Sequence, residues 1–195
     1  MGCILIRLRT HLRHLSVAGA ISNEPEYLAW AVRNLLELAV WAKYVAASAE
    51  NAKRVSNDSL IDLAEFQGAA LRLARKFEPT HSEIAALEQQ GQELTHSQAA
   101  AGLANDAKHL NIGALAREVG MAAEFYGFNA ILSKLVHPTS FSILLPLPLD
   151  RGPMEQLRLA FLGLGLGATD DALGYAVRCF EGQGLDCTML RAGIG

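Results

Sequence analysis

The stretch that most constrains the fold is residues 118–138, EVGMAAEFYGFNAILSKLVHP. From Glu124 to His137, its only formal charges belong to Glu124 and Lys134. A helix that is apolar on one side and nearly uncharged on the other is usually surrounded by other helices. Pro138 ends this helix, because the residue before a proline is pushed out of the α region. The pattern therefore predicts the central helix of the domain.

The two sides of this expected helix differ in chemistry. At 100° per residue, the apolar side carries Phe128, Ile131, Leu132 and Leu135. The opposite side carries Tyr126, Ser133 and His137, which fall within about 40° of one another. A tyrosine or histidine that is buried needs a hydrogen-bond partner. These three polar residues are therefore candidates for a site.

A second polar stripe lies on the helix expected over residues 24–49. Its aliphatic face consists of Leu28, Val32, Leu35, Leu36 and Ala39. Its other face carries Trp30, Arg33, Glu37, Trp41 and Tyr44. Arg33 and Glu37 are four residues apart and can pair on a helix. The aromatic residues on either side indicate that this pair is partly buried.

The two stripes could face each other across a pair of packed helices. One network would then satisfy every polar group, because a buried arginine needs a carboxylate and further acceptors. In the functional interpretation, His137 is a catalytic general acid or base and Arg33 anchors an anion. In the structural interpretation, the network that includes Glu37, Tyr126 and Ser133 only fixes the register of the helices. Both interpretations stay open.

The rest of the chain adds helices and no alternating strand pattern. Further helices are expected over residues 4–20, from Asn57 or Asp58 to Phe77, after a capping box at Thr80–Glu83, over residues 112–120 and over residues 154–180. The sequence thus predicts an all-α fold, a single-domain antiparallel bundle of about five to seven helices. The domain is expected to cover residues 1–181, and residues 182–195 are expected to form a poorly ordered, glycine-rich tail.

A glycine run in the last helix, GLGLGAT over residues 163–169, suggests a phosphate-binding loop at first sight. Its spacing fits neither a Walker loop nor a dinucleotide fingerprint, and no strand precedes it. We therefore expect these glycines to permit close helix packing or a kink.

Composition and charge limit the classes of function. The chain is 51% hydrophobic and 19% charged, which is typical of a compact globular protein. Its net charge of −3 gives no global electrostatic signature of nucleic-acid binding. The three scattered cysteines favour a reducing compartment over a disulfide framework. No apolar run is long enough to span a membrane. We expect a cytoplasmic protein with no membrane partner.

Two motifs contain candidate metal ligands. Glu93-x-x-His96 and Asp106-x-x-His109 repeat the spacing found in di-iron helical bundles. Those bundles place the motifs on different helices and add two carboxylates, whereas these motifs lie close together in a polar region. A solvated face is the simpler interpretation, so the sequence predicts no metal and no cofactor.

The segment RNLLE, followed far downstream by FYGFNAILSKLVHP, resembles an uncharacterised family of bacterial all-helical proteins. That family shows a tyrosine, then a Leu-Ser pair, then His-Pro, and the resemblance covers about residues 25–145. Such proteins are distantly similar to the HEPN superfamily, whose ribonucleases use an Arg-x4–6-His motif at a dimer interface. In this chain, Ile131 and Leu132 stand where that arginine would precede His137.

The resemblance implies a HEPN-like protein that acts in bacterial defence or a toxin–antitoxin system, with RNA-directed activity. It also implies a homodimer and an RNA or protein partner. The alternative is a non-catalytic helical module that binds a protein or a small ligand and whose polar cluster is structural.

Overall fold

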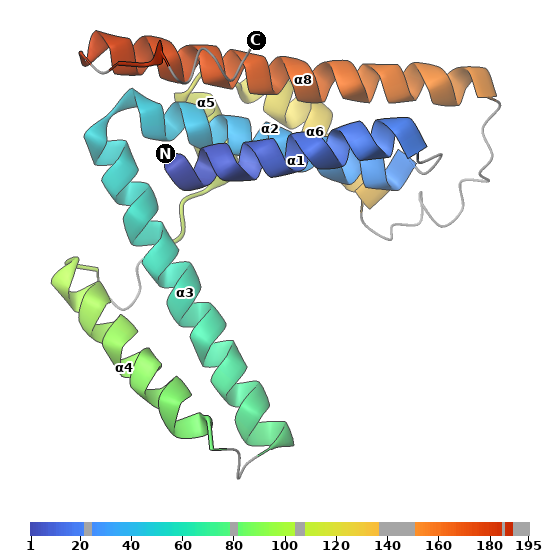
Figure 1. The fold of residues 1–195 in the computed structure, drawn as a ribbon. Coiled ribbons are helices and arrows are strands. Elements are labelled where there is room, and N and C mark those ends of the chain that lie inside the picture. Colours follow the sequence, from blue (N-terminus) through green and yellow to red (C-terminus); the bar gives the residue numbers. More distant parts are fainter. Residues whose placement is uncertain (22–24, 79–81, 104–107, 137–150, 185, 189–195) are drawn as a thin grey trace. The chain divides into compact units, whose positions relative to one another are not determined.

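The computed structural model describes residues 1–21, 25–78, 82–103, 108–136, 151–184 and 186–188 (Figure 1). This part of the chain forms seven helices and no strand, which confirms the predicted all-α helical bundle. The helices are α1 (Gly2–Ile21), α2 (Pro25–Ala47), α3 (Ala49–Phe77), α4 (Ile84–Ala100), α5 (Ile112–Glu118), α6 (Ala122–Val136) and α8 (Arg151–Gly182). No described helix is both long and apolar enough to cross a membrane.

The chain divides into two compact units. Unit 1 comprises Met1–Ala49 and Ile112–Gly195, and it contains α1, α2, α5, α6 and α8. Unit 2 comprises Glu50–Asn111 and contains α4 and nearly all of α3. The single domain expected over residues 1–181 stays a prediction, and most of the expected tail lies outside the described residues.

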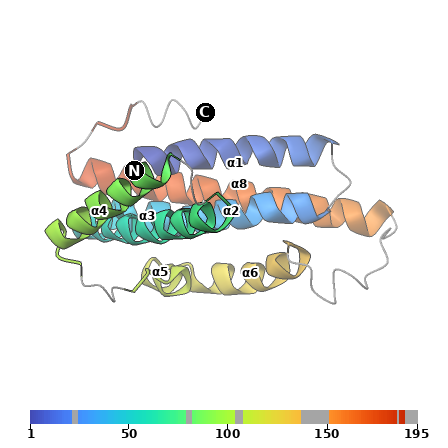
Figure 2. The same ribbon diagram turned by 90° about the horizontal axis from the view of Figure 1, so that it is seen from below.

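Helix α2 is the centre of unit 1, and α1, α5, α6 and α8 all pack on it. Figure 2 shows α1 on one side of α2 and α5 and α6 on the other. The buried apolar side chains of α2 are Leu28, Ala29, Ala31, Val32, Leu35, Leu36, Ala39, Val40, Ala42, Tyr44, Val45 and Ala46. A helix that is apolar around most of its circumference is stable only when other helices surround it.

The prediction that residues 118–138 form the central helix is wrong. Helix α6 buries only Phe125 and Leu132, whereas Phe128 and Ile131 are 39% and 53% exposed. The two buried residues are seven apart and therefore lie on one line along the helix. Because α2 occupies the centre of unit 1, α6 packs against it along this narrow line only. His137 and Pro138, the expected end of the helix, lie outside the described residues.

Helix α8 continues through the glycine run without a break. A Cβ atom at Gly165 would lie 3.0 Å from Leu15 Cδ2 and 3.3 Å from Leu35 Cδ1. At Gly163 and Gly167, by contrast, a Cβ atom would meet nothing within 4 Å. Close helix packing, one of the two expected roles of this run, is therefore confirmed at Gly165, where α8 approaches α1 and α2.

Unit 2 is a helical hairpin held by polar contacts. Gln67 Nε2 donates a hydrogen bond to the Leu87 carbonyl oxygen at 2.6 Å, and Gln98 Nε2 donates to the Leu60 carbonyl oxygen at 3.2 Å. Gln67 is the one buried residue of α3, and α4 has none. Among its described residues, unit 2 therefore buries no apolar side chain.

Candidate functional site

The predicted pair on α2 is present. Arg33 Nε donates a hydrogen bond to Glu37 Oε1 at 3.1 Å. The side chains are 26% and 32% exposed, so the pair is partly buried, as the flanking aromatic residues indicated. This geometry confirms the pairing and its burial.

The predicted residues of α6 make contacts of a different kind. The guanidinium of Arg117 on α5 lies 5.0 Å from the centre of the Tyr126 ring, which is a cation–π distance. Ser133 Oγ forms a long hydrogen bond of 3.5 Å with Asn129 Oδ1. His137 lies outside the described residues. The two-helix polar network, and catalytic roles for His137 and Arg33, therefore stay predictions.

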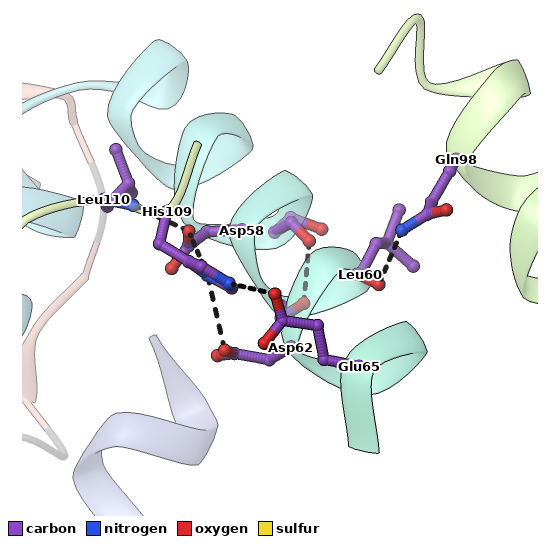
Figure 3. Close-up of polar contacts among 9 residues, drawn as sticks. Asp58, Leu60, Asp62, Glu65, Gln98, His109 and Leu110 are labelled. Carbon is purple, nitrogen blue, oxygen red and sulfur yellow. Dashed lines mark hydrogen bonds and ion pairs between the residues drawn. The ribbon is translucent and has the colours of Figure 1, made fainter. Parts of the chain in front are cut away.

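The structure brings together a different polar cluster in unit 2 (Figure 3). Asp58, Asp62 and Glu65 lie on α3, and their spacing of four and three residues places them on one face of the helix. His109 belongs to the segment that follows α4 and points between these three carboxylates. We call these four residues the carboxylate–histidine cluster.

The imidazole of His109 uses its two nitrogens differently. Nε2 lies 3.0 Å from Glu65 Oε1, which is hydrogen-bonding distance. Nδ1 lies 3.4 Å from Asp58 Oδ1 and 3.4 Å from Asp62 Oδ1. If the Nε2 proton is donated to Glu65, the lone pair of Nδ1 faces two carboxylates. The Nδ1 lone pair and the two carboxylate oxygens repel one another, so this arrangement requires a positive charge between them.

Asp58 fixes the position of the cluster. Its side chain is only 11% exposed, and its Oδ1 atom accepts a hydrogen bond of 2.8 Å from the Leu110 backbone N–H. This bond ties the chain to α3 at the residue next to His109, so the ring is held over the helix. Asp62 and Glu65 are 71% and 69% exposed, and the cluster therefore opens to solvent on their side.

The carboxylates raise the pKa of His109 above its ordinary value of 6.5. The hydrogen bond to Glu65 is the largest cause, and the charges of Glu65, Asp58 and Asp62 add to it. Partial desolvation of the ring acts in the opposite direction. The cluster thus favours a positive charge at His109, which a proton or a bound cation can supply.

The geometry also fits a metal ion. One ligand atom from each of Asp58, Asp62 and His109 lies within 4.8 Å of the other two. Ligands about 2.1 Å from a tetrahedral metal are separated from one another by about 3.4 Å. The two distances from Nδ1 to the carboxylates have this value. Glu65 would then accept the proton on Nε2, an arrangement that metal-binding histidines commonly show.

His109 belongs to one of the predicted motifs, but Asp106, its expected partner there, lies outside the described residues. Its actual carboxylate partners come from α3, much earlier in the chain. The spacing Asp58-x3-Asp62-x2-Glu65 was visible in the sequence and could have identified the acidic face. The other motif, Glu93-x-x-His96, belongs to no such cluster among the described residues. Glu93 accepts a hydrogen bond from Gln89, and His96 is exposed.

No protein-family model, curated protein or solved structure matches this chain. The HEPN-like relationship and the RNA-directed activity that it implies therefore stay predictions.

Proposed function

We propose that this protein is a helical module that binds a divalent transition-metal ion through Asp58, Asp62 and His109. The observation that carries the proposal is the position of His109 Nδ1, 3.4 Å from a carboxylate oxygen of each aspartate. The proposal departs from the sequence-based expectation of no metal. It is the ligand-binding alternative of the sequence analysis, with a different set of residues.

The donor atoms narrow the class of metal. An imidazole nitrogen favours zinc and neighbouring transition metals, whereas magnesium and calcium prefer sites made only of oxygen atoms. Two carboxylate oxygens beside the nitrogen also suit manganese. Because the side of Asp62 is open to solvent, water can occupy the remaining coordination positions. Zinc and manganese are therefore the ions to test.

Metal binding would have a structural effect on unit 2. The ion would connect α3 to the segment that follows α4, and it would close the loop of chain between Asp62 and His109. Unit 2 buries no apolar side chain among its described residues, so such a cross-link would contribute a large share of its stability. A ligand that binds only the folded state raises stability in proportion to the logarithm of its concentration.

Calorimetric titration of the metal-free full chain with Zn²⁺ and with Mn²⁺ tests the proposal. We expect wild type to bind at least one of these ions with a stoichiometry of one per chain. We expect D62N and H109Q to lose at least tenfold in affinity, because each removes one of the three ligands. Asp62 is 71% exposed, so D62N should keep the fold.

Two variants on α4 provide matched controls. E93Q and H96Q make the same chemical changes at exposed positions outside the cluster, and both should bind like wild type. Wild type that takes up neither ion would overturn the proposal. Equal binding by wild type, D62N and H109Q would show that the metal lies elsewhere and would overturn it as well.

A further inference from the structure

A stripe of large apolar side chains runs along α3 and is exposed to solvent. Leu63, Phe66, Leu73 and Phe77 are 49%, 71%, 57% and 70% exposed. With the small residue Ala70 between them, they follow one another at alternating intervals of three and four residues. This is the heptad spacing of a helix that packs lengthwise against another helix. We call these five residues the α3 stripe.

Helix α4 does not cover this stripe. It contacts α3 through Leu60, Gln67 and Arg75, the last of which pairs with Glu88 at 2.6 Å. On the helical wheel, these three residues lie about 80–160° from the centre of the stripe. The polar contacts with α4 therefore lie on one side of α3, and the four exposed large side chains of the stripe lie on another. Among the described residues of its unit, no helix covers this heptad stripe.

Charges along α3 are unevenly distributed beside the stripe. Asp62 lies near its N-terminal end, and Lys76 lies near its C-terminal end. Asp62 directly precedes Leu63, and Lys76 directly precedes Phe77, so both occupy the same flank, two heptads apart. In a parallel pair, Asp62 would face Gln67 of the other copy, five residues further along, so no opposite charges would meet there. Two antiparallel copies would place Asp62 of each copy opposite Lys76 of the other.

We propose that the α3 stripe is the interface of a homodimer in which the α3 helices of two copies pack antiparallel. The two-fold axis passes near Ala70, so the same surface serves both copies. The four large side chains of each stripe are then buried against those of the other, and the two hairpins share one apolar core. This interface goes beyond metal binding and does not require it.

Analytical ultracentrifugation of the full chain, over a concentration series and with a chelator present, tests the interface. We expect a dimer for wild type and a monomer for L73S. The matched control is L159S on α8, because Leu159 and Leu73 are both 57% exposed. L159S should remain dimeric. Circular dichroism should show the same helix content in wild type and both variants.

A charge exchange tests the antiparallel orientation. K76E places a carboxylate opposite Asp62 and should weaken the dimer at least tenfold. D62K/K76E restores opposite charges and should restore the dimer. If the helices are parallel, residues 62 and 76 do not face each other, so K76E should not weaken the dimer and D62K/K76E should not differ from it.

Three results would overturn the proposal: a monomeric wild type at every concentration, an L73S variant as dimeric as wild type, or a D62K/K76E variant that stays monomeric. A monomeric wild type would mean that another partner covers the stripe. Because the chelator removes any bound metal, failure of the metal site would leave these results unchanged.

Discussion

Two histidines in this chain illustrate how neighbouring residues shift a pKa in opposite directions. At His109, the Glu65 hydrogen bond and three carboxylate charges raise the pKa. At His11 on α1, partial burial lowers the pKa, and the nearby His14 and Arg7 lower it further. The His11 ring lies 5.4 Å from the His14 ring and 5.3 Å from the Trp30 ring. The two histidines should therefore titrate on opposite sides of pH 6.5.

The pKa shift of His109 predicts how stability depends on pH in metal-free protein. Because the folded-state pKa is raised, the protonated ring stabilises the fold fully below about pH 6.5, its unfolded value. This contribution is lost as the pH rises through the raised pKa. Urea unfolding of wild type and H109Q at a series of pH values should show a wild-type advantage in acid that disappears in alkali. NMR titration should place the pKa of His109 above 6.5 and that of His11 below it.

H96Q is the control for this prediction, because His96 is exposed on α4 and outside the cluster. Its stability should follow that of wild type at every pH. An advantage of wild type over H109Q that grows as the pH rises would contradict the assignment of the raised pKa to His109.

At the scale of the helix, one glycine sets how closely α8 approaches its neighbours. Leu15 and Leu35, the nearest side chains to Gly165, are 1% and 0% exposed, so other atoms of the core surround them. Thr169 adds to the contact from the next turn, since its Oγ1 atom donates a hydrogen bond of 2.8 Å to the Gly165 carbonyl oxygen. A methyl group at Gly165 would therefore require the Leu15 and Leu35 side chains to shift by a few tenths of an ångström.

We expect G165A to lower stability. Overpacking of a core costs about 1–3 kcal/mol, and the gain in helix propensity from glycine to alanine offsets about 1 kcal/mol of this. G163A and G167A are matched controls in the same helix, where a Cβ atom meets open space. They should raise stability by about 0.5–1 kcal/mol. Thermal unfolding of the three variants measures the difference, and a G165A variant as stable as G163A would disprove the tight contact.

Local patterns predicted most helices, because capping, periodicity and proline placement act within a few residues. Helix α3 begins at Ala49, eight residues before its predicted start near Asn57, because the residues before Asn57 show no apolar periodicity. The central position of α2 could not be predicted from either helix alone, since it depends on which helix the others surround. The carboxylate–histidine cluster was missed because a reversal of the chain after α3 brings His109 back to Asp58. Such contacts between distant residues leave no local pattern in the sequence.

At the scale of the whole molecule, the two units are stabilised in different ways. Every buried apolar side chain among the described residues belongs to unit 1. That unit also contains a charged pair in which one member is nearly buried. Lys43 on α2, whose side chain is 10% exposed, pairs with Asp171 on α8 and lies 5.5 Å from the centre of the Tyr175 ring. The pair joins the two longest contacting helices of the unit.

Removing the carboxylate should destabilise unit 1, because Lys43 would keep a nearly buried charge without its partner. Loss of one member of a fully buried pair costs about 3–5 kcal/mol. Asp171 is 55% exposed, so solvent screens the pair and we expect about 1–2 kcal/mol for D171N. The melting temperature should fall by about 2–8 °C. D170N, at the exposed neighbouring position, should melt like wild type, and equal melting of both variants would contradict a role for the pair.

The division of the chain also has an evolutionary consequence. Unit 1 is built from two separate segments, and unit 2 is an insertion between them. Lengthening, shortening or replacing this insertion would change no buried apolar side chain among the described residues. The cost of a longer or shorter connection rises only slowly with its length. Related chains can therefore differ greatly in the hairpin while they keep the same helical core. Metal binding and dimerisation, the two properties proposed for the hairpin, can then be gained or lost together.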